Sequence, residues 1–206
     1  MDFRDWPTLL VVDVEGNGGT PPDVIEIATA PIANGRIDDS RVRAWLIRPS
    51  RPITHFATGI HGITNSAVAD AHTWADIAPE VQAELDGVWI AAHNAAAVEY
   101  RVLKAHMPNW APSGVIDTLR LSRAVYVDAP KHNLDALIEH AGIDTAGILG
   151  QRHRAGFDAV ITARLLLDLA EHFDTFSAMV AAGVPAGLPG DSNIPTRPGP
   201  ETQPLW

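Results

Sequence analysis

The hydrophobic and polar positions of the first fifty residues follow the pattern of β-strands. Residues 8–15 contain an unbroken apolar run, and residues 24–30 alternate between apolar and polar side chains, as expected when successive side chains point to opposite faces. Residues 42–48 give a third such segment. Asn34-Gly35 lies between the second and third segments and is typical of a tight hairpin. We therefore expect these three strands to form an antiparallel meander.

The pattern then changes to helices that alternate with short strands. Helical spacing is found at residues 77–85, 95–107, 118–126, 134–141 and 156–182, and short apolar strands at 88–92 and 114–117. Strands that alternate with helices pair in parallel through right-handed crossovers. The predicted fold class is α/β, with a mixed five-stranded sheet, antiparallel and then parallel, and flanking helices.

The C-terminal residues have a different composition. From residue 183 onward, six prolines and four glycines fall among few apolar residues. Such a segment buries too little surface to offset its ordering entropy. We therefore predict one domain over residues 1–182 and a disordered tail over 183–206, which ends in Leu205-Trp206 as a docking handle or simply an exposed end.

Composition narrows the class of protein. The chain has 206 residues, 46% hydrophobic and 19% charged, which is typical of a globular domain with a proper core. It has no cysteine, so disulfides and thiolate metal sites are excluded. Neither a secretory signal nor a run of 18 apolar residues is present, and we expect a cytoplasmic protein without membrane contact.

The net charge of the chain and the local charge of one segment favour different conclusions about nucleic-acid binding. The formal net charge of −10 argues against nucleic-acid binding. Residues 41–69, however, contain no Asp or Glu but include Arg41, Arg43, Arg48, Arg51, His55 and His61. This segment is either a solvated strand edge or a surface that faces phosphate.

The most informative chemistry lies at the end of the first predicted strand. Asp13 and Glu15 stand two residues apart, so their carboxylates point to the same face. Buried like charges are costly unless something neutralises them, and a divalent cation does so for paired carboxylates. Gly16 and Asn17 begin a glycine-rich stretch that allows a tight turn and close approach of a ligand.

Further candidates lie far downstream. Asp158 falls in the first turn of a predicted helix, with His153 in the preceding loop, and Glu99 follows the pair His93-Asn94. Taken singly, each has an ordinary explanation: Asp158 as a helix cap, Glu99 as a solvated helix residue and His153 as a surface histidine. Asp117 is predicted to be the N-cap of the helix that starts at residue 118. Their combined order carries more weight than any one of them.

This order resembles the DEDDh 3′–5′ exonuclease superfamily, the group of the DNA polymerase III epsilon proofreading subunit, which has an RNase H-like fold. Residues 60–64 resemble the loop of that family that packs on the terminal nucleotide, and residues 117–123 and 134–143 resemble its later segments. The resemblance covers roughly residues 8–171. One departure stands out: the family's third acid is an aspartate five residues after the histidine of the His-Asn pair, where this chain has Val98. We interpret Glu99 as the substitute, displaced by a one-residue insertion.

The resemblance implies a set of roles. Two Mg²⁺ or Mn²⁺ ions would be held by Asp13, Glu15, Asp158 and Glu99, with Asp13 bridging them, and His153 would be the general base for the attacking water. The substrate would be a single-stranded or frayed 3′ end of DNA or RNA, and the product a nucleoside 5′-monophosphate. Ile63 would wedge against the terminal base. The residues implied to contact the substrate are Gly16, Asn17, His61, Ile63, Thr64 and Asn94.

Other hypotheses remain open at this point. The chain would be a binding module if the exonuclease fold has lost efficient catalysis, with Glu99 as the trace of that loss. It would be an internal nuclease if a related metal site cuts within a strand, although the His153/Asp158 pair favours trimming from an end. The sequence leaves open DNA against RNA, a polymerase or repair partner against a stand-alone enzyme, and the oligomeric state.

Overall fold

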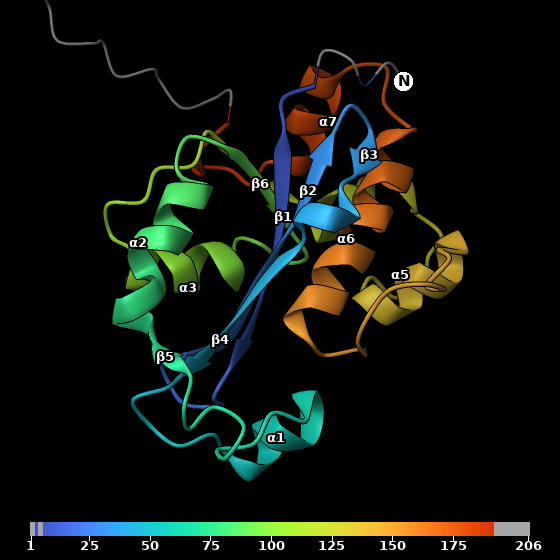
Figure 1. The fold of residues 1–206 in the computed structure, drawn as a ribbon. Coiled ribbons are helices and arrows are strands. Elements are labelled where there is room, and N and C mark those ends of the chain that lie inside the picture. Colours follow the sequence, from blue (N-terminus) through green and yellow to red (C-terminus); the bar gives the residue numbers. More distant parts are fainter. Residues whose placement is uncertain (1–2, 4–5, 192–206) are drawn as a thin grey trace, which may run out of the picture.

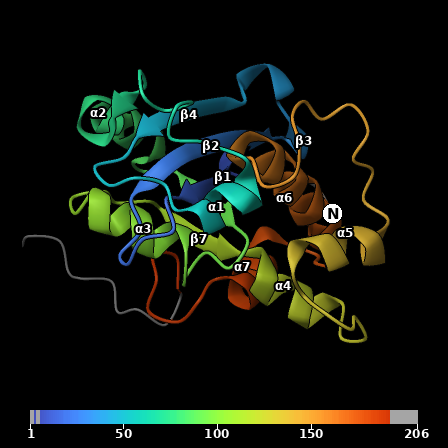
Figure 2. The same ribbon diagram turned by 90° about the horizontal axis from the view of Figure 1, so that it is seen from below.

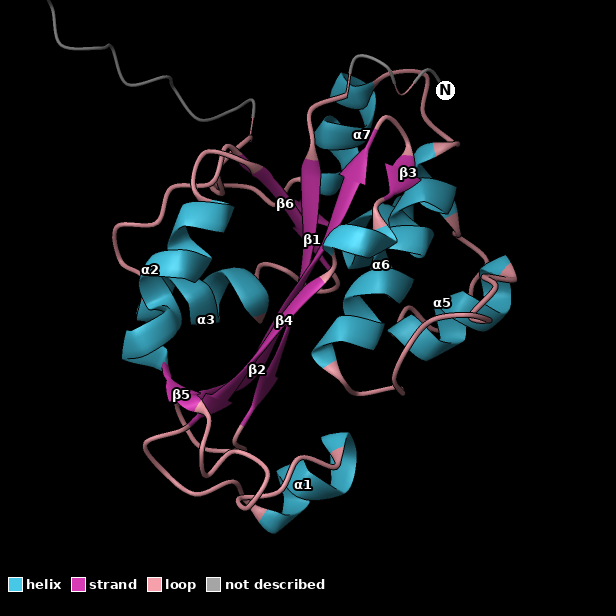
Figure 3. Ribbon diagram, viewed as in Figure 1, coloured by secondary structure: helices cyan, strands magenta, loops and turns pink. Residues whose placement is uncertain are grey.

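A mixed β-sheet forms the centre of the molecule, as seen in a computed structural model that describes residue 3 and residues 6–191 (Figures 1 and 3). The sheet has seven strands in the order β5-β4-β2-β1-β6-β7, with β3 paired to β2. Its strands are β1 (Leu9–Gly16), β2 (Val24–Ala33), β3 (Arg36–Ile37), β4 (Arg43–Arg48), β5 (His72–Thr73), β6 (Trp89–Ala92) and β7 (Gly114–Asp117). The antiparallel meander β1-β2-β4 and the parallel pairs β1-β6 and β6-β7 confirm the predicted fold class. The two strands beyond the predicted five, β3 and β5, have only two residues each, too few to give a sequence pattern.

The helices differ from the prediction in four places. They are α1 (His55–His61), α2 (Trp74–Leu85), α3 (Glu99–His106), α4 (Thr118–Val125), α5 (Leu134–Ala141), α6 (Ala155–Ala170) and α7 (Phe176–Gly183), with a 3-10 turn at Asp39–Arg41. Helix α1 was not predicted. Helix α2 begins at Trp74, three residues before the predicted start. Helix α3 starts four residues later than predicted, because Asn94 adopts a left-handed φ of 72° and the chain turns before it becomes helical. The predicted helix 156–182 is two helices, because Thr175 starts a new one by accepting a hydrogen bond from Ala178 N.

The helices cover both faces of the sheet (Figures 1 and 2). Leu9 and Val11 of β1 belong to the core shared with α4, α5, α6 and α7, whereas Leu10 and Val12 belong to the core shared with α2 and α3. This alternation follows from the two-residue period of a strand. Asp13 therefore continues the row of Leu9 and Val11 and lies on the α6 side.

The segment after α7 is ordered as far as residue 191. Val184 is buried, the β7 residue Val115 donates its backbone N–H to Pro189 O at 2.9 Å, and Leu188 packs on the core beneath α2 and α3. Residues 183–191, where the predicted tail begins, thus contact the domain, and the boundary between domain and tail stays a prediction. The segment has too few apolar residues for its sequence to indicate that it covers the edge of a sheet. Residues 192–206, including Leu205 and Trp206, lie outside the described residues.

A search of the described helices finds no segment long and apolar enough to cross a lipid bilayer.

Candidate active site

Three acidic side chains meet where β1 ends and α6 begins. Asp13 and Glu15 lie on the α6 side of β1, and Asp158 lies in the first turn of α6. Carboxylate oxygens of the three residues all lie within 4.8 Å of one another. Side chains 143 positions apart in the sequence are thus brought to one point, as the sequence analysis expected.

Small residues allow this approach. Asp13 faces Ala28 of β2 in the strand register, and the first residue of α6, Ala155, is fully buried with Ala159 one turn further on. A larger side chain at these positions would hold the start of α6 away from the sheet, because protein interiors are close-packed. The alanines thus set the distance between Asp158 and the end of β1.

The acidic cluster is electrostatically strained without a cation. Burial, followed by repulsion from Glu99 and Asp158, raises the pKa of Asp13 well above its usual value. Burial and the nearby Asp158 carboxylate raise the pKa of Glu15 to about 8. The fold therefore holds several carboxylates at a place where full ionisation is unfavourable, and a bound cation would reverse that penalty.

Glu99 approaches this cluster from α3. It is the first residue of that helix and only 4% exposed. Burial raises the pKa of Glu99 to about 8, with a further contribution from Asp117, and Glu99 in turn raises the pKa of Asp13. Its Oε2 is buried and has no hydrogen-bond partner among the described residues. Glu99 thus lies beside the other three acids, although outside their 4.8 Å group.

The donor set fits a hard divalent cation. Carboxylate oxygens are the ligands that Mg²⁺ and Mn²⁺ prefer, and the chain offers no thiolate to select a softer metal. The unpartnered Glu99 oxygen is an additional observation in favour, because a buried carboxylate oxygen without a partner is costly. The residues at this site therefore fit a divalent-metal centre.

His153 lies directly beside the cluster. Its φ of 62° is unusual for a residue with a side chain, and its backbone N–H donates to Asp158 Oδ2 at 3.1 Å. The preceding residue, Arg152, contacts Asp158 Oδ1 and donates to Asp135 Oδ1 at 2.5 Å. Sequence reasoning did not find Arg152, and its position next to His153 was the only available signal.

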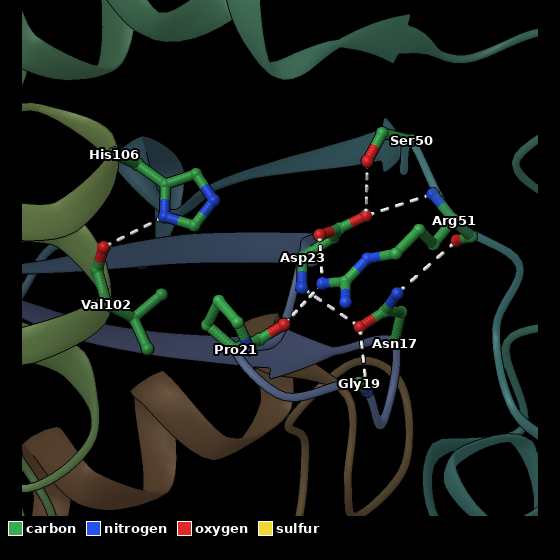
Figure 4. A network of polar contacts seen from close by, with 8 residues as sticks. All are labelled: Asn17, Gly19, Pro21, Asp23, Ser50, Arg51, Val102 and His106. Carbon is green, nitrogen blue, oxygen red and sulfur yellow. Dashed lines mark hydrogen bonds and ion pairs between the residues drawn. The ribbon is translucent and has the colours of Figure 1, made fainter.

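The loop after β1 is fixed by its own polar side chains (Figure 4). The Asn17 side chain is buried, and its Oδ1 accepts hydrogen bonds from Gly19 N at 3.0 Å and Asp23 N at 2.9 Å. The backbone N–H of Asn17 donates to Asp23 O, and the backbone carbonyl of Asn17 accepts from Thr54 N. Asn17 thus shapes the loop itself, and the prediction that its backbone approaches the substrate stays a prediction, as does that for Gly16.

Asp23 connects this loop to residues 41–69, the segment that contains no acidic residue. Burial would raise the pKa of Asp23, but hydrogen bonds from Arg51 and Ser50 lower it to about 2. Arg51 contacts Asp23 Oδ1 at 2.6 Å (Figure 4). Arg51, from the segment interpreted as either a solvated strand edge or a phosphate-facing surface, is therefore already paired with an acid of this protein.

The predicted nucleotide-contacting loop after α1 is largely inward-facing. Ile63 is 3% exposed and packs with Ile53 and Val68, and His61 is buried with its Nδ1 accepting from Ile63 N at 3.0 Å. Thr64 is exposed and bonds to Ser66. The exposed apolar side chains here, Phe56 and Ile60, lie on α1 itself. Contact of His61, Ile63 and Thr64 with a nucleotide stays a prediction.

The His-Asn pair connects the ends of β6 and β7. His93 Nδ1 lies 2.9 Å from Thr118 Oγ1, and its Nε2 lies 2.9 Å from His132 O. Asn94 N donates to Asp117 Oδ1 at 3.0 Å, and the same oxygen accepts from Leu119 N, so Asp117 caps α4 as predicted. Substrate contact by Asn94 stays a prediction.

Comparison with known proteins agrees with this geometry. The family model RNase_T, described as exonuclease, matches residues 10–166. Exodeoxyribonuclease 10 of Escherichia coli K12 is 32% identical over 162 residues, which are 78% of this chain and 68% of that protein. The DNA polymerase III subunit epsilon-like protein of Rhodobacter capsulatus is 34% identical over 187 residues, 85% of this chain.

One solved structure is similar to this chain in both fold and sequence. Exonuclease X in complex with 5′ overhanging duplex DNA superimposes with a TM-score of 0.71 at 31% identity, and the match covers 83% of this chain and 96% of that one. Some curated relatives are much longer: this chain spans 26% of the Rhodobacter protein and 17% of the 3′-5′ exonuclease DinG of Bacillus subtilis.

Proposed function

This chain belongs to the RNase_T exonuclease family, and we propose that it is a divalent-metal-dependent 3′–5′ exonuclease that releases nucleoside 5′-monophosphates from nucleic-acid ends. The single observation that carries the proposal is the convergence of Asp13, Glu15 and Asp158 at the end of β1, with His153 beside them. Carboxylates that converge from such distant positions offer the oxygen ligands for the divalent ions that assist phosphodiester hydrolysis, and this supports the proposal.

The acids would hold the metal ions. Asp13, Glu15 and Asp158 would be the ligands for one ion, and Glu99, with its unpartnered buried oxygen, would support a second. The ions, Mg²⁺ or Mn²⁺, would neutralise the phosphodiester and lower the pKa of the attacking water. Glutamate is one methylene longer than the aspartate usual at this position, and this reach suits a ligand that lies outside the tight group.

His153 would accept the proton of that water. Imidazole is the side chain that most often serves as a general base near neutral pH. The hydrogen bond from His153 N to Asp158 ties the position of the base to a metal ligand. Arg152, which contacts Asp158, is a cation beside the place where negative charge would gather.

We propose DNA as the substrate. The name of Exodeoxyribonuclease 10 and the DNA complex of Exonuclease X support DNA over RNA. A 3′ end that is single-stranded or frayed would reach the cluster most readily. The polymerase III proteins among the relatives make a polymerase a reasonable class of partner.

The alternative of a catalytically weakened binding module is not favoured. That alternative assumes that Glu99 at this position marks a metal site that no longer functions. Glu99 is nevertheless buried, and it lies near enough to Asp13 to raise the pKa of that residue. An internal nuclease would use the same metal chemistry, so the acidic residues do not distinguish it from an exonuclease. An experiment is needed to distinguish the two.

A substrate panel tests the proposal. The purified chain is incubated with 3′-labelled single- and double-stranded DNA and RNA, with Mg²⁺, Mn²⁺ or EDTA, and a circular single strand is included. We expect stepwise loss of 3′ nucleotides from linear DNA only when metal is present. Cleavage of the circle would indicate an internal nuclease, and inactivity on every substrate would support the binding module.

A further inference from the structure

A fifth acid, Glu26, lies at the same end of the sheet but does not join the metal group. It is on β2, directly opposite Glu15 of β1 in the strand register, and is 4% exposed. Cross-strand partners lie on the same face of a sheet, so Glu26 also faces α6. The tight group of carboxylates nevertheless consists of Asp13, Glu15 and Asp158 alone.

The carboxylate of Glu26 instead accepts hydrogen bonds from the residues at the start of α6. Arg154 contacts it through both Nε, at 3.0 Å, and a terminal nitrogen, as a two-pronged ion pair. Ala155 N donates to Glu26 Oε2 at 2.9 Å. Two parallel bonds from a guanidinium fix direction as well as distance. Glu26 therefore holds two successive residues of the chain from a neighbouring strand.

These contacts replace a cap that α6 lacks. Its N-cap residue, Arg154, makes no side-chain capping bond of its own, and the Glu26 carboxylate takes the first backbone N–H of the helix. A negative charge is favourable at this end of a helix. The start of α6 is thus anchored to the sheet through Glu26, one strand away from Glu15.

The residue between this anchor and the metal site is His153. Its left-handed backbone persists only if its surroundings hold it in place. On one side it is bonded to Asp158 through its own N–H, and on the other it is followed directly by the Arg154–Glu26 pair. The backbone of His153, from which the imidazole projects, is therefore held at both ends of a short segment.

We propose that Glu26 and Arg154 form a positioning pair that orients His153 and Asp158 toward the carboxylates of β1. The proposal rests on the function proposed above, because it assigns His153 as the base. Arg154 has a second effect: it neutralises Glu26, so that this acid does not compete as a metal ligand. Neither residue acts on the substrate.

The test uses the full chain and two conservative changes. Glu26→Gln keeps an oxygen for Ala155 N–H but removes the charge, and Arg154→Lys keeps the charge but loses the fork. On 3′-labelled single-stranded DNA with Mg²⁺, we expect kcat to fall about 10–100-fold in Glu26→Gln with KM nearly unchanged. Arg154→Lys should retain more activity than Arg154→Ala, because it keeps the ion pair in part.

Two further readouts do not depend on activity. The imidazole NMR signals of His153, assigned by their loss in His153→Ala, should shift in Glu26→Gln and Arg154→Ala. Mn²⁺ binding, measured by calorimetry, should change far less than in Asp158→Asn. The matched control is Arg43→Lys, which alters another ion pair between a strand and a helix, Arg43–Glu84, and should leave kcat and both readouts unchanged.

Each result decides the proposal. Unchanged kcat together with unchanged His153 signals would overturn it. A loss of Mn²⁺ binding as large as in Asp158→Asn would also overturn it and make Glu26 a metal ligand. If Glu26→Gln does not fold, Arg154→Lys carries the same test. If the wild-type chain trims no nucleic acid, the proposed function fails by itself, and the His153 signals still report whether the pair positions that residue.

Discussion

Two groups of acidic residues, one around the end of β1 and one on α2 beside β4, differ in what neutralises them. At the end of β1, Asp13 and Glu15 are partly buried and Glu99 of α3 is buried, and removal from water is the main cause of their raised pKa values. On α2, Glu80 and Glu84 lie over β4, where Arg43 contacts both.

The outcome of the two arrangements is opposite. A hydrogen bond from Arg43 lowers the pKa of Glu80, so this acid is stable as an ion within the protein. Two cations lie near the acids at the end of β1, but Arg152 contacts Asp158 and Arg154 is paired with Glu26, so among the described residues neither forms an ion pair with Asp13, Glu15 or Glu99. The position of the counter-ion, more than the number of acids, therefore distinguishes a structural ion pair from a site that requires a ligand.

The largest effect is expected from the metal ligands. Asp13→Asn or Asp158→Asn should reduce metal-dependent 3′ trimming on the order of 10³-fold or more, because several kcal/mol of charge stabilisation are lost. The fold should remain, since removal of one charge relieves repulsion in the cluster. Gel assays of a labelled strand and circular dichroism measure the two quantities. Wild-type activity in either variant would remove the cluster from the mechanism.

The next effect concerns the base. His153→Ala should lower kcat by about 10²–10⁴-fold and change KM little, because the imidazole is expected to act on the water and not on substrate affinity. Steady-state kinetics with single-stranded DNA measures both constants. A large rise in KM with kcat preserved would instead assign His153 to binding.

A smaller effect is expected at Glu99. Glu99→Ala should reduce kcat by roughly 10–100-fold and weaken the binding of the second ion, which calorimetry with Mn²⁺ can count. Glu99→Gln serves as the control, because it keeps the shape of the side chain. Full activity in the alanine variant would show that the second-metal assignment is wrong.

The comparison also predicts how stability depends on pH. In metal-free protein, the pKa of Glu15 is about 8 when folded and near 4.5 when unfolded, so the unfolded state loses its proton first as pH rises. Stability linked to this group is full below about pH 4.5 and is lost as pH rises through 8. The Tm in EDTA should therefore fall between pH 5 and 8, and less so in Glu15→Gln.

Added metal should reverse this trend. Mn²⁺ binds the ionised carboxylates, so it should raise the Tm more at pH 8 than at pH 5. Thermal scans with and without metal measure the difference. A Tm that is flat with pH in EDTA, for wild type and variant alike, would contradict the raised pKa values.

The smallest effect is expected in the other acidic group. Arg43→Ala removes the partner of Glu80 and Glu84, yet the side chain of Arg43 is 45% exposed and water screens such pairs. The Tm should change by less than about 3 °C and trimming not at all. A loss of activity here would mean that Arg43 faces the substrate.

Five of the seven strands were predicted from the sequence because they form apolar or alternating runs next to turn signals. The sequence placed α5 at its observed bounds, where Asn133 and Gly142 act as end signals. It did not predict α1, whose residues have little apolar periodicity, or the break between α6 and α7, where two apolar helices follow each other closely. The sequence shows which residues favour a helix, but not where packing ends it.

The candidate site was predicted in its acids but not in their environment. The order of Asp13, Glu15, Glu99 and Asp158 indicated that they act together. The structure brings Asp13, Glu15 and Asp158 within 4.8 Å of one another and places Glu99 close enough to raise the pKa of Asp13. The burial of Ile63, the internal use of Asn17 and the contacts of Arg152 depend on tertiary packing. The Glu26–Arg154 pair joins residues 128 positions apart, a separation at which a single sequence gives no pairing signal.

The segment that follows α7 has a practical consequence for work with this protein. β7 is the last strand of the sheet, and the bond from Val115 N to Pro189 O gives its outer side a partner. A protein shortened to residue 182 would lose that cover, and an uncovered strand edge invites pairing with other molecules. Expression of the catalytic unit alone should therefore extend to at least residue 191, well past residue 166, where the family match ends.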